Sequence, residues 1–545
     1  MTNDLIEILD SVPPRRSMRI SATRAVGRSR YGLSLPLIFG LGVYALIAGH
    51  GGAVLHDPDT YLHIAVGRWI IEHRAVPHYG IFSGTMPQAP WVAHEWLGEA
   101  LLAWLFDTFG WAGLVAVTAF CIAAAVAMLL RKLLHCLVPV HAMIATALAV
   151  TLVIPHVLAR PHVFTLPILV TWVAGLVRAR SEDRAPPAWL AALMVLWANL
   201  HGGYLFGLGL AGLLAAEAVL LAPDWRIRRR VAGGWAFFGV LAIGAALLTP
   251  YGIDGLLLPF RVTGMSFAMG QLVEWRSPDF QSFEPLELWL AVVLFAGFAL
   301  GWRLPPTRLL MLLLLLHMAL QHRRHGELVG LVAPLLLAPA LAPQLTALST
   351  GRSPGPVDRS LAELAKPASV RGVALAGGVL VAVSAAVLHG AATRTDVAMP
   401  AAALAAVAAS HMTGPVLNDY GFGGYLIFSG TPPFIDGRAE LYGDEFIKRY
   451  VHAMLLESDE LPKLLDQYGI AWTLIAPERP AALLLDHLPG WRRLYADDVA
   501  VVHVRTDPAA PDRGQLLPPR HSDACLVGAL NAGRRGDPRC AGTGD

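Results

Sequence analysis

Long apolar blocks that are almost free of charged residues recur along this 545-residue chain. The longer blocks reach roughly 17 to 25 residues, the length that a helix needs to cross a hydrocarbon core about 30 Å thick. Only 15% of the residues are charged, against about 25% in an average soluble domain, which excludes a single water-soluble fold of this size. We therefore expect a polytopic α-helical membrane protein with about eleven transmembrane helices. The apolar blocks are 31–49, 111–130, 139–158, 163–177, 188–200, 204–221, 231–248, 286–299, 309–320, 328–341 and 373–388.

Basic residues in the connections orient these blocks. Residues 1–30 are rich in arginine and lack an apolar region followed by a small-residue cleavage site, which predicts a retained cytoplasmic tail. Every second connection after this tail is basic, as the positive-inside rule requires, and an odd number of crossings places the chain after about residue 391 outside. We expect a multi-pass protein of a bacterial inner membrane, with a cytoplasmic N-terminus and a periplasmic C-terminal domain. The basic residues are Arg131, Lys132, Arg178, Arg180, Arg184, Arg226, Arg228, Arg229, Arg230, Arg303, Arg308, Arg352, Arg359, Lys366 and Arg371.

The C-terminal part is polar enough to form a small α/β domain. The runs PVLNDY, GGYLIF, AWTLIAP and VAVVHVR predict strands, and DEFIKRYVHAMLLES predicts a helix. The expected domains are the tail at 1–30, a transmembrane domain at 31–390 with a large first outer loop at 50–110, a periplasmic domain at 391–508 and a disordered tail at 509–545. Cys525 and Cys540 could form a disulfide there, whereas the four cysteines lack the close paired spacing of a structural zinc site.

The first outer loop contains the run HDPDTYLHIAVGRWIIEH, residues 56–73. Asp57 is a favourable N-cap, and Asp59 in the first turn complements the helix dipole. Apolar residues recur at helical spacing, which predicts an amphipathic helix able to lie along the membrane surface. Two carboxylates two residues apart, beside His63, are also what a general base or a metal site would use. The apolar face consists of Leu62, Val66, Trp69 and Ile70.

The same loop continues into WVAHEWLGEALLAWLFD, which places Glu95 and Glu99 one helical turn apart. The simpler interpretation is a solvated helix face at the membrane interface. The alternative is that His94 and Glu95 join an outer-face site.

Two adjacent arginines, Arg323 and Arg324, lie in an outer connection between His322 and His325. The positive-inside rule does not account for basic residues in an outer connection. Guanidinium groups bind phosphate through bidentate contacts. This connection is therefore our candidate for binding the phosphate of an anionic lipid carrier; the alternative is snorkelling or pairing with Glu327. Further polar groups at outer turns that could converge on one site are Arg160, His162, Asn199, His201, Glu274, Arg276 and Asp279.

Two segments of the C-terminal domain combine glycines with charged residues, and one of them contains Asp436 and Arg438. A structural ion pair is the simpler interpretation, and a domain that caps the cavity and recognises the acceptor is the alternative.

The sequence has no GxSxG, GxGxxG after a strand, P-loop or HExxH, so hydrolase, dinucleotide and nucleotide-triphosphatase functions lack support. A net charge of +2 without long basic runs gives no indication of nucleic-acid binding.

These motifs together resemble the GT-C superfamily of polytopic glycosyltransferases. The acidic pair, the helix with Trp69 and the HEW run are similar to the superfamily pattern, and later segments resemble a bacterial branch of it; the resemblance spans residues 31 to about 505. The later segments are ARPHVF at 159–164, WANLHGGYL at 197–205, TPYG at 249–252, EWRSPDF at 274–280, NDYGFGGYL at 418–426 and FIDGRAELYG at 434–443.

The resemblance implies an inverting hexosyl- or pentosyltransferase on the extracytoplasmic face. It implies a polyprenyl-phosphate-linked sugar donor and an acceptor such as a lipid-linked glycan. Asp57 is then the candidate base and Asp59 its partner, with the choice between them left open, and the pair could hold a divalent cation, Mg²⁺ or Mn²⁺.

Two other functions remain as alternatives. A polytopic transporter or lipid-linked glycan flippase would need charges within spans and related halves of the chain. The ionisable groups within spans are chiefly Glu217 and His317, and no repeat is evident. A scaffold for envelope-polysaccharide assembly is the weaker alternative.

Overall fold

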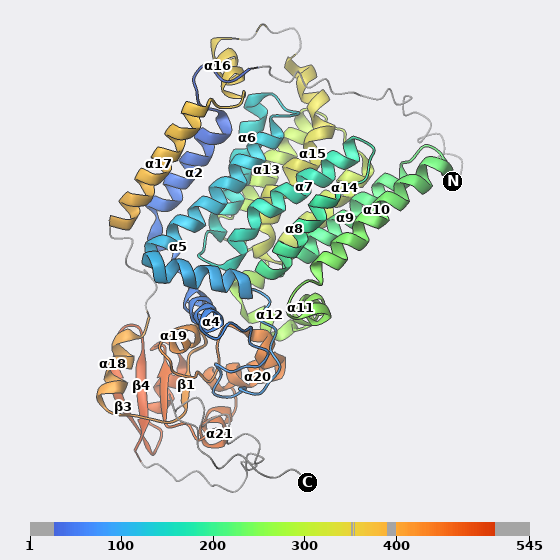
Figure 1. The fold of residues 1–545 in the computed structure, drawn as a ribbon. Coiled ribbons are helices and arrows are strands. Elements are labelled where there is room, and N and C mark those ends of the chain that lie inside the picture. The colour runs from blue at the N-terminus through green and yellow to red at the C-terminus, as the bar shows by residue number, and fades with distance from the viewer. Residues whose placement is uncertain (1–26, 350–352, 354, 390–398, 507–545) are drawn as a thin grey trace, which may run out of the picture.

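The computed structural model describes residues 27–349, 353, 355–389 and 399–506. Most of the expected N-terminal tail, the whole of the expected C-terminal tail, and both Cys525 and Cys540 lie outside the described residues. The chain forms a helical domain and a smaller C-terminal domain with a sheet (Figure 1).

The helical domain contains a helix at each of the predicted apolar blocks. Among the described residues, 5 helices are long and apolar enough to cross a membrane, so the exact number of crossings stays a prediction. The helices are α2 (Leu35–Gly49), α3 (Gly51–Val54), α4 (Asp59–His73), α5 (Trp96–Leu133), α6 (Pro139–Val153), α7 (Leu166–Ser181), α8 (Ala188–Leu200), α9 (Tyr204–Leu220), α10 (Trp225–Ala246), α11 (Gly252–Thr263), α12 (Ser266–Gln271), α13 (Pro285–Ala299), α14 (Pro306–Gln321), α15 (Gly326–Ser349), α16 (Pro356–Leu364) and α17 (Val370–His389). Short 3₁₀ turns are η1 (Ile154–His156), η2 (Pro161–Thr165), η3 (Val273–Trp275) and η4 (Arg323–His325).

Helix α5 changes direction at Gly110, whose φ of 62° is outside the helical range. The part before this glycine belongs to the first outer loop, and the part after it corresponds to the second apolar block. Glycine tolerates this positive φ, so the chain can turn between two helices, one forming a wall of the loop and the other the apolar second part of α5.

The C-terminal domain contains a four-stranded sheet with the order β1-β2-β4-β3. Strand β1 runs parallel to β2, and β4 is antiparallel to both β2 and β3. Residue Leu417 pairs with Thr473, and Thr473 pairs in turn with His503. The elements are α18 (Ala401–Ala409), β1 (Val416–Asn418), η5 (Tyr420–Phe422), α19 (Gly423–Phe428), α20 (Ala439–Met454), α21 (Glu460–Gln467), β2 (Trp472–Ile475), α22 (Pro480–Leu485), β3 (Trp491–Ala496) and β4 (Val501–Arg505).

The prediction of a strand at GGYLIF is wrong, because this run forms the helix α19. Strand β3 was not predicted from the sequence. Tyr425 and Phe428 are three residues apart and both place their rings against Tyr61 of α4, with ring centroids 5.0 and 5.3 Å away. This contact requires helical spacing, so tertiary packing overrides the strand propensity of the aromatic residues.

Helix α4 lies between the two domains (Figure 1). The expectation that its apolar face rests on the membrane surface is wrong, because Leu62, Val66 and Ile70 share a buried core with Leu417 and Phe434 of the C-terminal domain. The C-terminal domain is thus packed directly onto the first outer loop.

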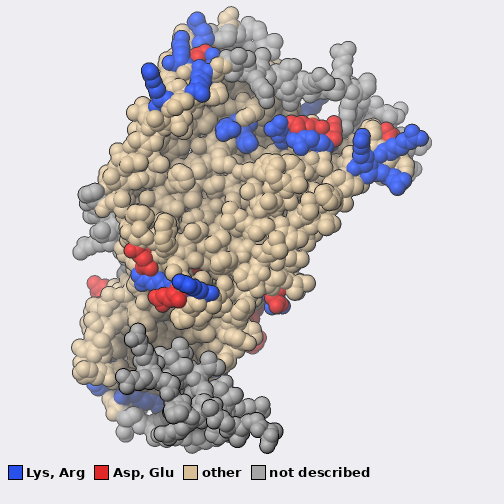
Figure 2. Space-filling model, viewed as in Figure 1, with Lys and Arg blue, Asp and Glu red and all other residues tan. Residues whose placement is uncertain are grey.

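Lysine and arginine side chains gather at the end of the helices remote from the C-terminal domain. Figure 2 shows them on one face, above a band of helix surface without charged side chains. This distribution agrees with the alternation of basic connections in the sequence, and a membrane location follows from the apolar helices. The assignment of this end to the cytoplasm stays a prediction.

Candidate functional site

Asp57 lies just before α4 and is 3% exposed. Its Oδ1 accepts a hydrogen bond from the backbone N–H of Asp59 at 3.1 Å, but the prediction of Asp57 as the N-cap is wrong by one residue, because Pro58 is the N-cap and the helix begins at Asp59. The main partner of Asp57 is Arg160, which immediately precedes η2. The Nη2 of Arg160 donates to Oδ1 at 2.9 Å, and its Nε donates to Oδ2. Asp57 is therefore a fixed carboxylate in a bidentate pair.

Arg160 also contacts two further carboxylates. Its Nη2 donates to Asp59 at 3.1 Å, and its Nη1 lies 2.8 Å from Glu274 of η3. The side chains of Asp59 and Glu274 are 32% and 36% exposed. A single guanidinium thus gathers three carboxylates from two separate parts of the chain, and two of them are about one-third exposed.

The two aspartates have different pKa values because their surroundings differ. Burial opposes ionisation of Asp57, but the charge and hydrogen bonds of Arg160 outweigh it, so the pKa of Asp57 falls below its ordinary value. Burial raises the pKa of Asp59 to about 6; the charge of Arg160 opposes this shift and the neighbouring charge of Asp57 adds to it. Asp59 is the carboxylate that titrates near physiological pH.

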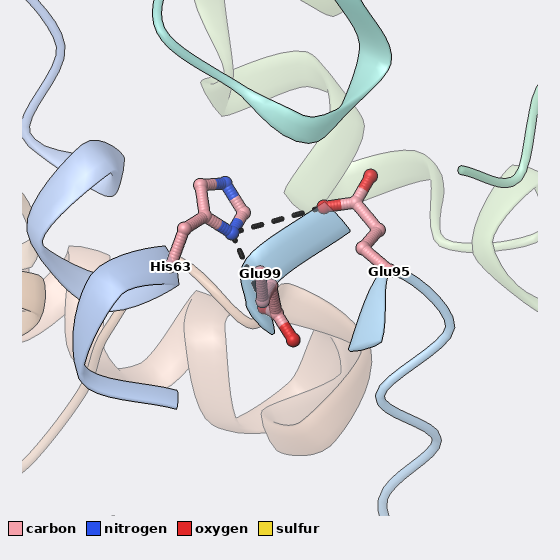
Figure 3. A group of neighbouring side chains, drawn as sticks. All are labelled: His63, Glu95 and Glu99. Carbon is pink, nitrogen blue, oxygen red and sulfur yellow. Dashed lines mark hydrogen bonds and ion pairs between the residues drawn. The ribbon is translucent and has the colours of Figure 1, made fainter. Parts of the chain in front are cut away.

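A second cluster lies one helical turn further along α4 (Figure 3). His63 Nδ1 is 3.2 Å from Glu99 Oε1 and 3.8 Å from Glu95 Oε2. Helices α4 and α5 meet closely here, because a Cβ atom at Gly67 would lie 2.0 Å from the carbonyl oxygen of Glu99. Glu99 is 4% exposed, so the interpretation of Glu95 and Glu99 as a solvated face is wrong.

This cluster attracts positive charge. Burial alone would lower the pKa of His63, but the hydrogen bond to Glu99 and the charges of Glu95 and Glu99 raise it to about 9. Glu95 also faces His201 Nε2 at 3.3 Å and His94 Nε2 at 3.7 Å. The predicted residues His63, His94, Glu95 and His201 are thus brought together, and Glu99 is added to them.

Asn199 in the last turn of α8 and His201 directly after this helix support this arrangement. Asn199 accepts a hydrogen bond from Trp96 Nε1 at 2.8 Å and donates to the Leu248 carbonyl at 2.9 Å. Burial lowers the pKa of His201 to about 4. The charge of Glu95 acts to raise this pKa, and the charge of Arg324 acts to lower it. The ring of His162 lies 6.1 Å from that of His201.

The predicted phosphate-binding connection forms η4, and its members have different partners. Arg323 pairs with Glu284 at 3.2 Å rather than with Glu327. His322 and His325 place their Nδ1 atoms 2.6 and 3.1 Å from the carbonyls of Trp275 and Met318. In the described part of the chain, no carboxylate lies within ion-pair distance of Arg324, whose guanidinium is 4.7 Å from the centre of the Trp275 ring.

Two predicted residues stay outside the cluster and hold the nearby turn instead. Arg276 donates to the carbonyls of Gly270 and Gln271, and Asp279 accepts from the backbone N–H of Gln281.

The C-terminal domain covers one side of Asp59. A Cβ atom at Gly437 would lie 2.5 Å from Asp59 Oδ1, so the glycine backbone rests directly against this carboxylate. Burial and the charges of Asp59, Asp436 and Glu440 raise the pKa of Tyr420 well above its ordinary value, which keeps its hydroxyl protonated. The sequence motifs contained Gly437 and Tyr420, but nothing in the sequence indicated that they face the first outer loop.

Asp436 and Arg438 form the structural pair that the sequence suggested. Two hydrogen bonds of 2.7 Å join them, both residues are buried, and Tyr442 donates to Asp436 at 2.6 Å. The guanidinium of Arg438 lies 4.6 Å from the ring centre of Trp91 in the first outer loop. The pair therefore fixes the segment around Gly437 on that loop.

An open apolar groove of about 530 Å³ begins next to these clusters. Its walls are the start of α5, the outward face of α8 and the segment after α10, and it reaches Trp96 and Asn199. The lining residues are Trp96, Leu97, Ala192, Val195, Leu196, Asn199, Leu248, Thr249 and Pro250. Hydropathy alone does not reveal a groove, because it depends on which helices pack together.

No protein-family model and no curated protein sequence matches the chain. Among solved structures, it is similar to the archaeal oligosaccharyltransferase AglB from Archaeoglobus fulgidus in complex with an inhibitory peptide and a dolichol-phosphate. The TM-score is 0.45 and the identity 10%, over 81% of this chain and 69% of that one. It is also similar to ArnT from Cupriavidus metallidurans bound to undecaprenyl phosphate, with a TM-score of 0.41 and 12% identity over 86% of this chain and 97% of that one.

Identity this low leaves the function of the chain to be inferred from its own residues.

Proposed function

We propose that this chain is a GT-C-type membrane glycosyltransferase that transfers a sugar from a polyprenyl-phosphate-linked donor to an acceptor on the extracytoplasmic face. The observation that carries the proposal is the state of Asp59. It is a partly exposed carboxylate with a pKa of about 6, held between the outer ends of the helices and the C-terminal domain.

Asp59 is the better candidate for the general base. A base acts best when its pKa is near the working pH and when it can reach the proton that it removes. Asp57 meets neither condition, because it is buried, its pKa is lowered and both of its oxygens are bound by Arg160. We assign to Asp57 the positioning of Arg160 and to Asp59 the proton transfer.

The proposed reaction is a single displacement. The acceptor hydroxyl oxygen attacks the anomeric carbon of the donor sugar, and its proton passes to Asp59. The bond between the anomeric carbon and the phosphate oxygen breaks, and the lipid phosphate leaves with the bonding electron pair. Attack opposite the leaving group inverts the anomeric configuration.

Arg324 is the best placed of the predicted phosphate ligands. Its guanidinium stacks on Trp275 and has no carboxylate partner among the described residues, whereas Arg323 is engaged by Glu284. An arginine without a carboxylate partner is free to stabilise negative charge as it develops on the leaving phosphate. The apolar groove beside Trp96 offers a surface of matching character to the polyprenyl chain.

Asp57 and Asp59 fit the expected Mg²⁺ or Mn²⁺ ion poorly. Arg160 already binds both carboxylates and fills the place that a cation between them would need. The proposed mechanism therefore routes no step through a metal at this pair, and the guanidinium supplies the positive charge there.

The experiment that tests the proposal uses the purified full chain in lipid nanodiscs. A panel of polyprenyl-phosphate-linked hexoses and pentoses serves as donors, and released polyprenyl phosphate is measured. We expect the variant Asp59→Asn to lose at least about 100-fold in transfer, since a general base contributes roughly 10² to 10⁴. Asp254→Asn is the matched control, because Asp254 is an exposed aspartate of α11 paired only with exposed Arg261 among the described residues.

Two results would contradict the proposal. One is wild-type transfer by Asp59→Asn with any donor that the native chain uses. The other is that the native chain, folded and monodisperse, turns over no hexosyl or pentosyl donor of the panel.

A further inference from the structure

We infer that the start of α10 binds the headgroups of anionic phospholipids, at the end of the helical domain remote from the C-terminal domain. This run, the arginine segment, is WRIRRR at 225–230 and has arginine at four of its six positions. Figure 2 shows blue side chains gathered where α10 begins, at the right of the view. Lipid binding here is independent of glycosyl transfer, and it concerns the leaflet at this end, whichever compartment that leaflet borders.

The arginine segment stands clear of the other helices. All six of its residues are exposed, whereas Trp235 and Phe238, further along α10, are buried in the core of the helical domain. A helix rises about 1.5 Å per residue, so six residues cover about 9 Å along the axis. The headgroup layer on each side of a bilayer is roughly 5 to 8 Å thick. The arginine segment is therefore long enough to cross that layer.

The rest of α10 indicates where the hydrocarbon core of the bilayer begins. Residues 231–246 contain no charged side chain, and Phe237 and Val240 on the outward face are 64% and 69% exposed. In a polytopic chain, such an uncharged apolar surface faces lipid tails. The sequence changes from arginine to apolar residues at Val231, so the arginine segment lies in the adjacent headgroup layer.

The charge of the arginine segment is not balanced within the described residues. No carboxylate there lies within ion-pair distance of any of its four arginines, and the guanidinium of Arg229 instead lies 5.7 Å from the centre of the Trp225 ring. Asp224 precedes the segment, but it acts as the N-cap and accepts a hydrogen bond from the backbone N–H of Ile227 at 2.9 Å. The segment thus keeps an excess of positive charge.

Two other arginines at this end are already paired, since Glu182 binds Arg178 and Arg184 at 2.7 and 2.5 Å. The positive-inside rule is met by connections with two basic residues, such as Arg131 and Lys132. Four arginines within the first two turns of α10 exceed what orientation requires. The dipole of α10 also disfavours positive charge at its N-terminus. An anionic partner would offset this unfavourable interaction.

The arrangement of the four arginines indicates the kind of partner. Successive residues of a helix are rotated by about 100°, so these arginines point to several sides of α10. A layer of lipid headgroups surrounds an exposed helix end on several sides, whereas a folded acidic protein contacts one face of it. Guanidinium groups bind phosphate through bidentate contacts, and Trp225, 67% exposed, is of the type enriched at membrane interfaces. The partner that fits is an anionic phospholipid such as phosphatidylglycerol.

The test is lipid binding by the full chain in detergent, measured without a glycosyl donor. Dioctanoyl phosphatidylglycerol and dioctanoyl phosphatidylcholine are titrated separately, and bound lipids are counted by native mass spectrometry. We expect saturable binding of phosphatidylglycerol and at least about tenfold weaker binding of phosphatidylcholine. Each basic residue near an anionic surface contributes about fivefold, so Arg228→Gln/Arg230→Gln should lower the affinity for phosphatidylglycerol roughly 25-fold.

The matched control is Arg178→Gln/Arg184→Gln. It removes the same charge from the same end, at residues already paired with Glu182, so we expect a change of about twofold or less. Arg228→Lys/Arg230→Lys keeps the charge and should retain most of the affinity. The variants of the arginine segment change only exposed side chains, and their unfolding temperatures in detergent check that they fold.

Two further measurements separate this site from other occupants and other sites. Arg324→Gln, at the opposite end of the helices, should leave the affinity for phosphatidylglycerol unchanged, and an equimolar polyglutamate peptide should not displace the lipid. Equal binding of the two lipids, equal affinity of Arg228→Gln/Arg230→Gln and its control, loss of binding only in Arg324→Gln, or displacement by polyglutamate would overturn the inference. None of these results bears on Asp59, whose loss of transfer is measured separately.

Discussion

Two clusters of buried charge lie at opposite ends of the helical domain, and their compositions are inverted. At the end next to the C-terminal domain, one cation, Arg160, faces three carboxylates. At the other end, one anion, Glu217 of α9, faces Arg180 of α7 and Arg308 of α14 at 3.1 and 3.0 Å. Both clusters join several helices, yet we propose a function for only one of them.

The Arg160 cluster and the Glu217 cluster differ in solvent exposure and in charge balance. The side chains of Glu217, Arg180 and Arg308 are all at most 11% exposed, and Arg180 also pairs with Asp183, so two arginines face two carboxylates. The cluster around Arg160 keeps Asp59 and Glu274 about one-third exposed and leaves negative charge in excess. A closed, balanced cluster is a structural tie, whereas an open, unbalanced one can bind and react. Glu217, a charge on which the transporter alternative depended, belongs to the closed cluster.

Replacing Glu217 with glutamine should give the largest effect on stability. The variant leaves two buried arginines without their shared counterion, and removing one partner of a buried ion pair costs about 3 to 5 kcal/mol. We expect a large fall in the unfolding temperature of the chain in detergent, while the folded fraction retains its transfer rate.

The control is Glu182→Gln at the same end of the helices, where the exposed pair with Arg178 is worth about 1 kcal/mol or less. Equal unfolding temperatures of Glu217→Gln and Glu182→Gln would show that the Glu217 cluster is no structural tie. A loss of transfer by well-folded Glu217→Gln would remove the contrast between the two ends.

The helices could be predicted from the sequence, because each apolar block is identified from its own residues without knowledge of tertiary contacts. The prediction failed where tertiary contacts decide, as in α19, which is helical because Tyr425 and Phe428 must both reach Tyr61. It also misplaced the apolar face of α4, since hydropathy does not distinguish a face that meets lipid from one that meets another domain.

Several residues of the candidate site could be predicted from the sequence, but the contacts between them could not. Asp57 and Asp59 were recognisable from their position after the first span, but Arg160 is 103 residues beyond Asp57, and no local pattern indicated that it binds both. The burial of Glu99 depends on the contact between α4 and α5 at Gly67, which amino-acid spacing does not reveal.

Substituting Gly437 with alanine tests whether the C-terminal domain sets the geometry of Asp59. The new Cβ would lie 2.5 Å from Asp59 Oδ1, and the hydrogen bond to Arg160 limits how far the carboxylate can retreat. A displacement near 1 Å at a reacting group can cost about 100-fold, so we expect a loss of up to about that size in the transfer rate at saturating substrate. Gly421→Ala is the control, because its Cβ would meet nothing nearer than 3.8 Å. Unchanged transfer in Gly437→Ala would show that this contact is irrelevant to the reaction.

The smallest expected effect is on the pH dependence of kcat/KM, and it distinguishes Asp57 from Asp59 as the base. If ionised Asp59 is the base, kcat/KM falls about tenfold per unit below pH 6 and levels off above it, because the pKa of Asp59 is about 6. The charged groups that act on Asp59 are Arg160, Asp57, His63 and Glu274. Asp57→Asn removes one negative neighbour, which favours the ionised form of Asp59.

The residual activity of Asp57→Asn should therefore have its inflection at lower pH than the native chain. Initial rates between pH 4.5 and 8 give both profiles, and pre-incubation at each pH followed by assay at pH 7 controls for unfolding. An inflection that disappears in Asp57→Asn while Asp59→Asn keeps it would reassign the base to Asp57. The inflection of the native chain would then report the fixed carboxylate of the cluster, and the partly exposed one would serve only to hold Arg160.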